Sequence, residues 1–259
     1  MATYSPGPEK DPDNKRTSYL NQTLDSLADT IDFRHHSLYV TANAVNSEAE
    51  SVLIYWEKAG IITHVIWNDT NTGTAYAINQ AWAYRKPGEH AIKMDDDVVI
   101  HSSGWVNILE ECIERDPSIG ICGLKRKDCA EHPDSQNAWY KSRVYMLPQQ
   151  PGQRWLICEE VQHVMGTCQM FSSALLDKMG YMVQPRQYGF DDALAAVRCK
   201  VAGFKSVFYP AIEIDHIDDG QSPYQQWKHK VSGEDMAAYQ QMVQEYISGK
   251  RPVYYNPFQ

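Results

Sequence analysis

Three consecutive carboxylates end an apolar stretch in the segment Ala91-Ile92-Lys93-Met94-Asp95-Asp96-Asp97-Val98-Val99-Ile100. Carboxylates this close together repel one another and lose hydration when they are buried, so a nearby positive charge must offset them. Side chains alternate along an extended chain, which places Asp95 and Asp97 on one side and Asp96 on the other. Two oxygens on one side suit a hard divalent cation such as Mn²⁺ or Mg²⁺. The alternative is an acidic turn that leads into a helix capped near Ser102.

Strand and helix patterns alternate around this segment. Apolar residues recur at helical spacing after Thr17, Ser47-Glu48-Ala49-Glu50 is a capping-box signature, and Pro87-Gly88 stops a further helical stretch. The patterns predict strands at 2–4, 36–42, 63–67 and 90–94, and helices at 17–31, 47–60, 74–84 and 105–115. Such alternation is typical of βαβ units, so we expect an α/β, Rossmann-like fold with a mostly parallel central sheet flanked by helices.

The second half of the chain is less regular. Residues 124–155 are polar and rich in Lys, Arg, Gln and Pro, which predicts a long functional loop. The later patterns predict strands at 155–165, 168–171, 206–209 and 212–216, a short helix ending at Gly180, and helices at 192–202 and 234–247. No change in composition divides the chain, so we expect a single domain over residues 1–259.

The composition excludes several classes of protein. The 259 residues are 43% hydrophobic, and 24 Lys and Arg against 33 Asp and Glu give a net charge of −9, which argues against strong non-specific attraction to nucleic acid or anionic membranes. The longest apolar runs fall far short of the roughly 18 residues that a membrane-spanning helix needs. The N-terminus lacks a secretory signal, and the six cysteines include no C-x-x-C pair. We therefore expect a cytoplasmic protein without a membrane span.

Two further groups of residues carry chemistry. Asp191 and Asp192 begin a predicted helix, where they are either cap and dipole partners or a general base for a hydroxyl. His216 follows Asp215 at the end of an apolar stretch, where the imidazole is either structural or a nitrogen ligand to the same ion.

Taken in order, these segments resemble family 2 glycosyltransferases with the GT-A fold, the Rossmann-like fold of nucleotide-diphospho-sugar transferases. The resemblance spans residues 16–216. The blocks that carry it are Tyr19 to Leu27, Asn71-Thr72-Gly73, Lys93 to Asp97, Gly166 to Phe171, Tyr188 to Leu194, Arg198, Ala202-Gly203-Phe204 and Tyr209 to His216.

The resemblance implies a role for each matched residue. It implies that Asp95, Asp97 and His216 hold Mn²⁺ or Mg²⁺, and that this metal offsets charge on the leaving diphosphate. It implies that Asp192 is the catalytic base and that Asp191 holds the acceptor or orients the base. The donor, most simply a UDP-sugar, would be contacted by residues from three parts of the chain: Tyr4, Ser5, Asn71, Gly73, Asp95 and Asp96.

The implied activity is metal-dependent, inverting transfer of a sugar from a nucleotide-sugar to a hydroxyl acceptor. Within the single domain, residues 1–123 would bind the nucleotide-sugar, 124–220 would hold the acceptor and the catalytic groups, and 221–259 would form a terminal helix and tail.

Three alternatives stay open. A phage-type transferase acting on hydroxymethylated DNA bases would need a local basic face within 124–155, built from Lys125, Arg126, Lys127, Lys141, Arg143 and Arg154. A nucleotidyltransferase would carry a Gly-rich phosphate loop after the first strand, which 5–16 fits poorly. A non-catalytic nucleotide-sugar-binding protein would not need the acidic pair. Four aromatic residues are candidates for stacking on a sugar or for packing: Trp139, Tyr140, Trp155 and Tyr188.

Overall fold

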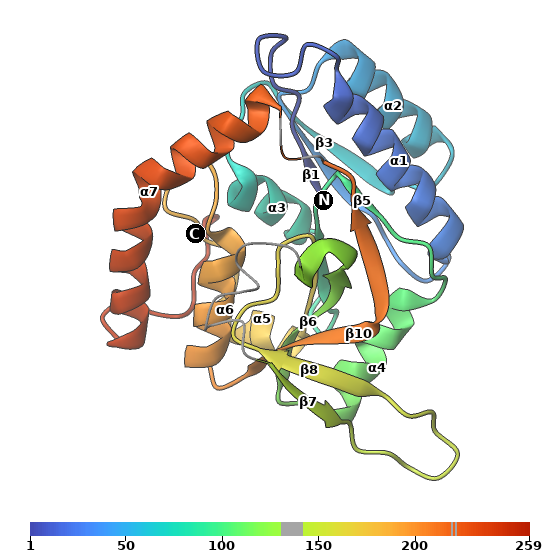
Figure 1. Cartoon of the computed structure of the whole chain (residues 1–259), viewed down its shortest axis with the longest axis vertical. Coiled ribbons are helices and arrows are strands. Elements are labelled where there is room, and N and C mark those ends of the chain that lie inside the picture. The colour runs from blue at the N-terminus through green and yellow to red at the C-terminus, as the bar shows by residue number, and fades with distance from the viewer. Residues whose placement is uncertain (131–141, 219, 221) are drawn as a thin grey trace.

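The computed structural model describes residues 1–130, 142–218, 220 and 222–259. The N-terminal part alternates strands and helices (Figure 1). Its elements are β1 (Ala2–Thr3), α1 (Lys15–Thr30), β2 (Tyr39–Asn43), α2 (Ser47–Lys58), β3 (His64–Asn68), α3 (Thr74–Trp82), β4 (Ala91–Met94), β5 (Val98–Val99) and α4 (Trp105–Arg115). The strands and helices predicted here are confirmed, with bounds that differ by a few residues. The cap of α2 is Asn46, whose side chain accepts a hydrogen bond from the amide of Ala49.

The C-terminal part departs further from the expected pattern. Its elements are β6 (Ile119–Arg126), the 3-10 helix η1 (Lys127–Ala130), β7 (Arg143–Met146), β8 (Ile157–Val161), β9 (Cys168–Phe171), α5 (Ser173–Met179), α6 (Asp191–Val201), β10 (Lys205–His216) and α7 (Pro223–Ile247). Residues 124–155 are therefore not a loop throughout, because β7 pairs with β8 and the end of β6 pairs with β10. Residues 131–141, including Trp139, Tyr140 and Lys141, lie outside the described residues.

Two further predictions about this part are corrected. The two strands expected at 206–209 and 212–216 are one strand, β10, which accommodates Pro210 through a shift in its register against β6 between Tyr209 and Glu213. The terminal helix begins eleven residues before the expected Glu234, because Ser222 accepts a hydrogen bond from the amide of Gln225 and Pro223 occupies the first turn of α7.

The strands form two sheets. β1, β2 and β3 are parallel, whereas the second sheet has the order β4-β9-β6-β10-β8-β7, with β5 beside β10. In this second sheet β6 and β10 are parallel and the other pairs are antiparallel. The α/β class with flanking helices is confirmed, but the second sheet is mixed rather than mostly parallel. A parallel neighbour needs a crossover of a dozen or more residues, and β7, β8 and β9 follow one another with no helix between them.

Helices cover both faces of the second sheet. Trp105 and Leu109 of α4 pack in one core cluster with Cys122 of β6. On the other face, Ile121 packs with Leu175 of α5 and with residues of α3 and α6. The alternation of Ile121 and Cys122 between the two clusters is that of a strand buried on both faces. This framework fixes the ends of β4, β6 and β10 in one place.

The two ends of the chain are tied to this framework. α1 and α2 pack beside β1–β3, and α7 runs along the opposite side of the molecule (Figure 1). The buried guanidinium of Arg198 donates hydrogen bonds to the carbonyl oxygens of Tyr181 (2.7 Å) and Val253 (3.1 Å), which holds the C-terminal tail against α6. None of the helices described is long and apolar enough to cross a membrane.

Candidate active site

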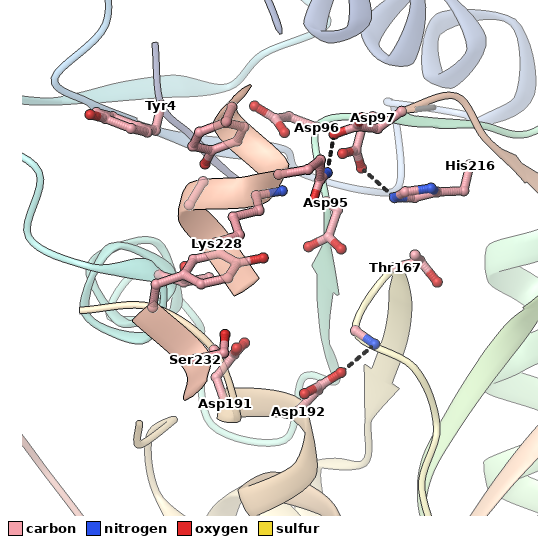
Figure 2. A pocket seen from close by; sticks show the side chains of 18 of the residues that line it. Tyr4, Asp95, Asp96, Asp97, Thr167, Asp191, Asp192, His216, Lys228 and Ser232 are labelled. Carbon is pink, nitrogen blue, oxygen red and sulfur yellow. Dashed lines mark hydrogen bonds and ion pairs between the residues drawn. The ribbon is translucent and has the colours of Figure 1, made fainter. Parts of the chain in front are cut away.

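A cavity of about 530 Å³ lies where β4 and β10 end and α6 begins, beside α7 (Figure 2). Most of the predicted site residues line it: Tyr4, Asn71, Asp95, Asp96, Asp97, Asp191, Asp192 and His216. Ser5 and Gly73 are not among the lining residues. Gly73 has a structural reason to be glycine, since it precedes α3 with a φ of 88° and a Cβ there would lie 2.8 Å from the carbonyl oxygen of Gln187. Donor contacts by Ser5 and Gly73 stay a prediction.

Arg16, in the first turn of α1, supplies positive charge beside two of the three consecutive carboxylates. Its Nη1 lies 2.8 Å from Oδ2 of Asp97 and 3.1 Å from Oδ2 of Asp218, and its Nη2 hydrogen-bonds Oδ1 of Asp96. Thr3 Oγ1 donates a 2.6 Å hydrogen bond to the other oxygen of Asp96. All of these side chains are buried. The guanidinium of Arg16 therefore offsets part of the negative charge of Asp96 and Asp97. In the sequence alone, this negative charge was the reason to expect a metal ion.

Lys93 does the same for Asp95, which lies two residues further along the chain. Its Nζ is 2.6 Å from Oδ1 of Asp95 and 2.5 Å from the carbonyl oxygen of Gly166. Burial opposes a charge here, but Asp95 and Asp191 raise the pKa of Lys93 above its ordinary value, so the ammonium stays charged. Because Nζ is also 3.9 Å from Oδ2 of Asp191, Lys93 connects the two acidic groups of the cavity.

Asp97 and His216 offer a partial site for a divalent ion. Oδ1 of Asp97 is buried without a hydrogen-bond partner and lies 3.5 Å from Nε2 of His216. Burial raises the pKa of Asp97, but Arg16 and His216 hold it well below its usual range, so the carboxylate is ionised. Carboxylate oxygen and imidazole nitrogen are both ligands that Mn²⁺ accepts. Within the described residues no three side chains of His, Cys, Asp or Glu are grouped closely enough to hold a metal ion, and Asp95 is paired with Lys93.

Asp192, the second residue of α6, is held in place by several donors. It accepts hydrogen bonds from the amides of Gly166 (2.9 Å) and Ala193 (2.8 Å), and its Oδ2 lies 3.2 Å from Nε2 of His163. Burial acts in the opposite direction, but His163 and the other contacts hold the pKa of Asp192 well below its usual range. This carboxylate is ionised and oriented.

Asp191 has different surroundings although it is the adjacent residue. Its Oδ2 is buried without a hydrogen-bond partner. Burial, opposed by Lys93 and reinforced by Asp192, raises the pKa of Asp191 to about 6. The two neighbouring carboxylates therefore differ in basicity.

The turn before these carboxylates packs closely against α7. A Cβ on Gly189 (φ 85°) would lie 2.8 Å from Oγ of Ser232. Phe190, which caps α6 with a left-handed φ of 64°, stacks on Tyr239 with ring centroids 4.4 Å apart. Lys228 reaches from α7 into the same cavity (Figure 2). The position of α7 is thus coupled to that of the acidic pair.

The model of the family described as glycosyltransferase like family 2 matches residues 12–232, which includes every acidic residue described above. The chain belongs to this family. The expected enzyme class, a glycosyltransferase, is thereby confirmed. No curated protein sequence matches the chain.

Solved structures share the GT-A fold with this glycosyltransferase at low sequence identity. The mannosyltransferase PcManGT from Pyrobaculum calidifontis, in complex with GDP-Man and Mn²⁺, has a TM-score of 0.63 and 13% identity over 94% of this chain and 67% of its own. Residues 1–349 of TarS from S. aureus give 0.64 and 14% over 95% and 64%. GalNAc-T7 with UDP, GalNAc and Mn²⁺ gives 0.56 and 15% over 86% and 47%. This chain therefore spans about half to two thirds of those solved chains.

Three cations of this glycosyltransferase's site were not predicted from the sequence: Arg16, Lys93 and Lys228. Lys93 was the most accessible to prediction, because it lies two residues before Asp95 and so on the same side of the strand. Arg16 contacts a carboxylate 81 residues away, and Lys228 belongs to a part of α7 that was not predicted to be helical. The local spacing of residues does not indicate contacts between residues so far apart in the sequence.

Proposed function

We propose that this glycosyltransferase moves a sugar from a nucleoside diphospho-sugar to a hydroxyl acceptor with inversion at the anomeric carbon, and that it requires a divalent cation. One arrangement supports this proposal most directly. Asp95 to Asp97 and the pair Asp191-Asp192 face each other across one cavity, joined by Lys93 (Figure 2). The first group is placed to hold the diphosphate end of the donor, and the second is placed to activate the acceptor.

The donor and metal assignments rest on charge and on relatives. Carboxylates outnumber Lys and Arg among the described lining residues, so a diphosphate needs additional positive charge to enter. Mn²⁺ or Mg²⁺ would be held by Asp97, His216 and Asp95, and when bound it supplies a Lewis acid that offsets charge on the diphosphate. PcManGT and GalNAc-T7 are solved with Mn²⁺ and with GDP-Man or UDP. We extend Mn²⁺ to this chain and keep a UDP-sugar as the expected donor.

Donor contacts are proposed for Tyr4 and Asn71, which line the cavity. Asp96 was expected to contact the donor, but both of its oxygens already accept hydrogen bonds from Arg16 and Thr3. We therefore assign Asp96 to holding Arg16 in place beside the donor.

Asp192 is the proposed catalytic base. It takes the proton of the acceptor hydroxyl while that oxygen bonds to the anomeric carbon; the bond from this carbon to the diphosphate oxygen breaks, and the nucleoside diphosphate leaves with the electron pair. The Asp192 side chain is 25% exposed against 9% for Asp191, so an acceptor reaches it more readily. Gly166 and His163 orient it. Asp191, with its pKa of about 6, is the second candidate for this role and is otherwise placed to hold the acceptor.

A DNA-base acceptor is less well supported. Four basic residues of the segment 124–155 form ion pairs with carboxylates: Lys125 with Glu159, Arg126 with Asp128, Lys127 with Asp215, and Arg154 with Glu111. Paired side chains leave little net positive charge for phosphates. We favour a hydroxyl acceptor outside nucleic acid. The five cysteines described as free thiols are buried, which supports the proposed reducing, cytoplasmic compartment.

The test is calorimetric titration with UDP and with GDP, each with and without Mn²⁺, followed by hydrolysis and transfer assays with the matching nucleotide-sugars. We expect Mn²⁺-dependent binding of one nucleotide and loss of that dependence in Asp97→Ala. Asp25→Ala, which changes an exposed carboxylate on α1, is the matched control and should behave as the wild type. Binding of neither nucleotide, or an unchanged response to Mn²⁺ in Asp97→Ala, would contradict the proposal.

A further inference from the structure

Lys228 differs from the other cationic side chains that line the cavity. Among the described lining residues, each of the other Lys and Arg side chains pairs with a carboxylate: Arg16 with Asp97 (2.8 Å), Lys93 with Asp95 (2.6 Å) and Arg126 with Asp128 (2.8 Å). Within the part of the chain that is described, no Asp or Glu oxygen lies within 4.0 Å of the ammonium of Lys228. Its charge is therefore available to a ligand.

Two aromatic rings hold this ammonium in position. It lies 4.6 Å from the ring centroid of Tyr224 and 5.4 Å from that of Tyr188. Such contacts attract a cation without cancelling its charge. Burial, together with the nearby Arg16, lowers the pKa of Lys228 below its ordinary value. The charged form is therefore less stable here than in water, and a bound anion would stabilise it.

We propose that Lys228 binds the diphosphate of the donor from the α7 side of the cavity and stabilises it as the leaving group. This inference rests on the proposed function. Figure 2 shows Lys228 extending from α7 into the space beside Asp95, across the cavity from His216. A diphosphate beside Asp95 and Asp97 would therefore meet fixed positive charge from a second direction.

The same contact would connect donor binding to the catalytic turn. Tyr188, which contacts the ammonium of Lys228, directly precedes Gly189. Gly189 in turn approaches Ser232, one helical turn further along α7. A diphosphate held by Lys228 would thus fix α7 against the turn that carries Asp191 and Asp192. Lys228 should affect both the affinity for a nucleoside diphosphate and the rate of transfer.

The experiment compares Lys228→Met, which keeps most of the side-chain length and removes the charge, with Lys228→Arg. Lys230→Met is the matched control, because Lys230 is exposed on the same helix and does not line the cavity. Calorimetry with Mn²⁺ present measures binding of whichever of UDP or GDP the wild type binds, and of uridine or guanosine alone. We expect Lys228→Met to weaken diphosphate binding about 10- to 100-fold, since a charge-assisted hydrogen bond is lost, and to change nucleoside binding less than about twofold. Lys228→Arg should restore most of the affinity.

Each other outcome has a definite meaning. Diphosphate binding by Lys228→Met at the wild-type level would overturn the inference, and so would an equal loss for diphosphate and nucleoside, which indicates a general disturbance of the cavity. If Asp97→Ala loses Mn²⁺-dependent binding while Lys228→Met does not, the proposed function stands and the role of Lys228 is wrong. If the wild type binds neither nucleotide, both fail. Thermal unfolding of each variant confirms that it is folded.

Discussion

The acidic cluster after β4 and the acidic pair at the start of α6 are made of the same residue type but are balanced differently. Asp95 and Asp97 lie 2.6 Å and 2.8 Å from the buried cations Lys93 and Arg16. Oδ2 of Asp191 is buried without a hydrogen-bond partner, as Oδ1 of Asp97 is, but Asp191 has its cation, Lys93, only at 3.9 Å. Carboxylates fixed beside buried cations suit the binding of a ligand, whereas the acidic pair combines an ionised, oriented carboxylate, Asp192, with a neighbour whose pKa is raised, Asp191, which suits the transfer of a proton.

The strongest test of this contrast removes the charge of Asp192. Asp192→Asn keeps the size of the side chain, so we expect donor affinity to stay within about threefold of the wild type while turnover falls about 10²- to 10⁴-fold, the usual contribution of general base catalysis. Steady-state kinetics and calorimetry measure the two effects separately. Substantial turnover in Asp192→Asn, combined with its loss in Asp191→Asn, would exchange the proposed roles of the two residues.

The second test removes the cation Arg16 from the acidic cluster after β4. Arg16→Met leaves the buried carboxylates of Asp96, Asp97 and Asp218 without their shared partner. Breaking a buried ion pair from one side costs about 3–5 kcal/mol, so we expect a loss of this order in the free energy of unfolding, measured with urea. Lys15→Met, an exposed change on the same helix, is the control. An equal, small effect of both substitutions would show that the acidic cluster does not depend on Arg16.

The fold was predictable where local signals and tertiary contacts agree. In the first half, α2 is bounded by Asn46 and Gly60 and α3 by Gly73, and the alternation of strands and helices was predicted correctly except for the two-residue strand β5. The prediction of a loop over residues 124–155 was wrong at β7, because this strand carries exposed polar and apolar side chains at the edge of the sheet. Such a pattern does not distinguish a strand from a loop. The start of α7 was predicted too far along the sequence because the first half of this helix buries little besides Tyr224. The apolar residues there show only a weak helical period.

The site was predictable in its anions and not in its cations. Consecutive carboxylates after an apolar strand cannot be buried without positive charge beside them, so Asp95 to Asp97 indicated a site. The source of that positive charge is set by tertiary structure. Arg16 lies on α1 and Lys228 on α7, and only the folded chain brings both side chains to the cavity that the carboxylates line.

The third test uses the unusual basicity of Asp191. Its pKa of about 6 lies above the usual value of 3.8, so its ionisation costs the folded protein stability as the pH rises from about 4 to above 6. Asp191→Asn avoids this cost and should be more stable than the wild type at pH 7.5, by about 1–3 kcal/mol. The gain should shrink at pH 5, where Asp191 is largely protonated. Urea unfolding at both pH values measures it, and a gain that does not change with pH would contradict the raised pKa.

The smallest effect concerns the contact between the acidic pair and α7. Gly189→Ala places a Cβ 2.8 Å from Oγ of Ser232, whereas Gly88→Ala, at the same φ of 85°, meets nothing within 4 Å. Both variants carry the cost of a left-handed alanine, about 1–2 kcal/mol, so their difference isolates the contact with α7. We expect Gly189→Ala to lose slightly more stability, and to lose turnover that Gly88→Ala keeps, because the turn and α7 must separate.

Adding Ser232→Ala removes the clashing oxygen and leaves a Cβ at 3.7 Å. If the contact couples α7 to the acidic pair, the double variant should recover the stability and turnover of Gly88→Ala. If turnover stays low in the double variant while stability recovers, the hydroxyl of Ser232 itself acts in the cavity that it lines. That result would move Ser232 from the packing of α7 into the acceptor end of the site, on the same side as Asp191.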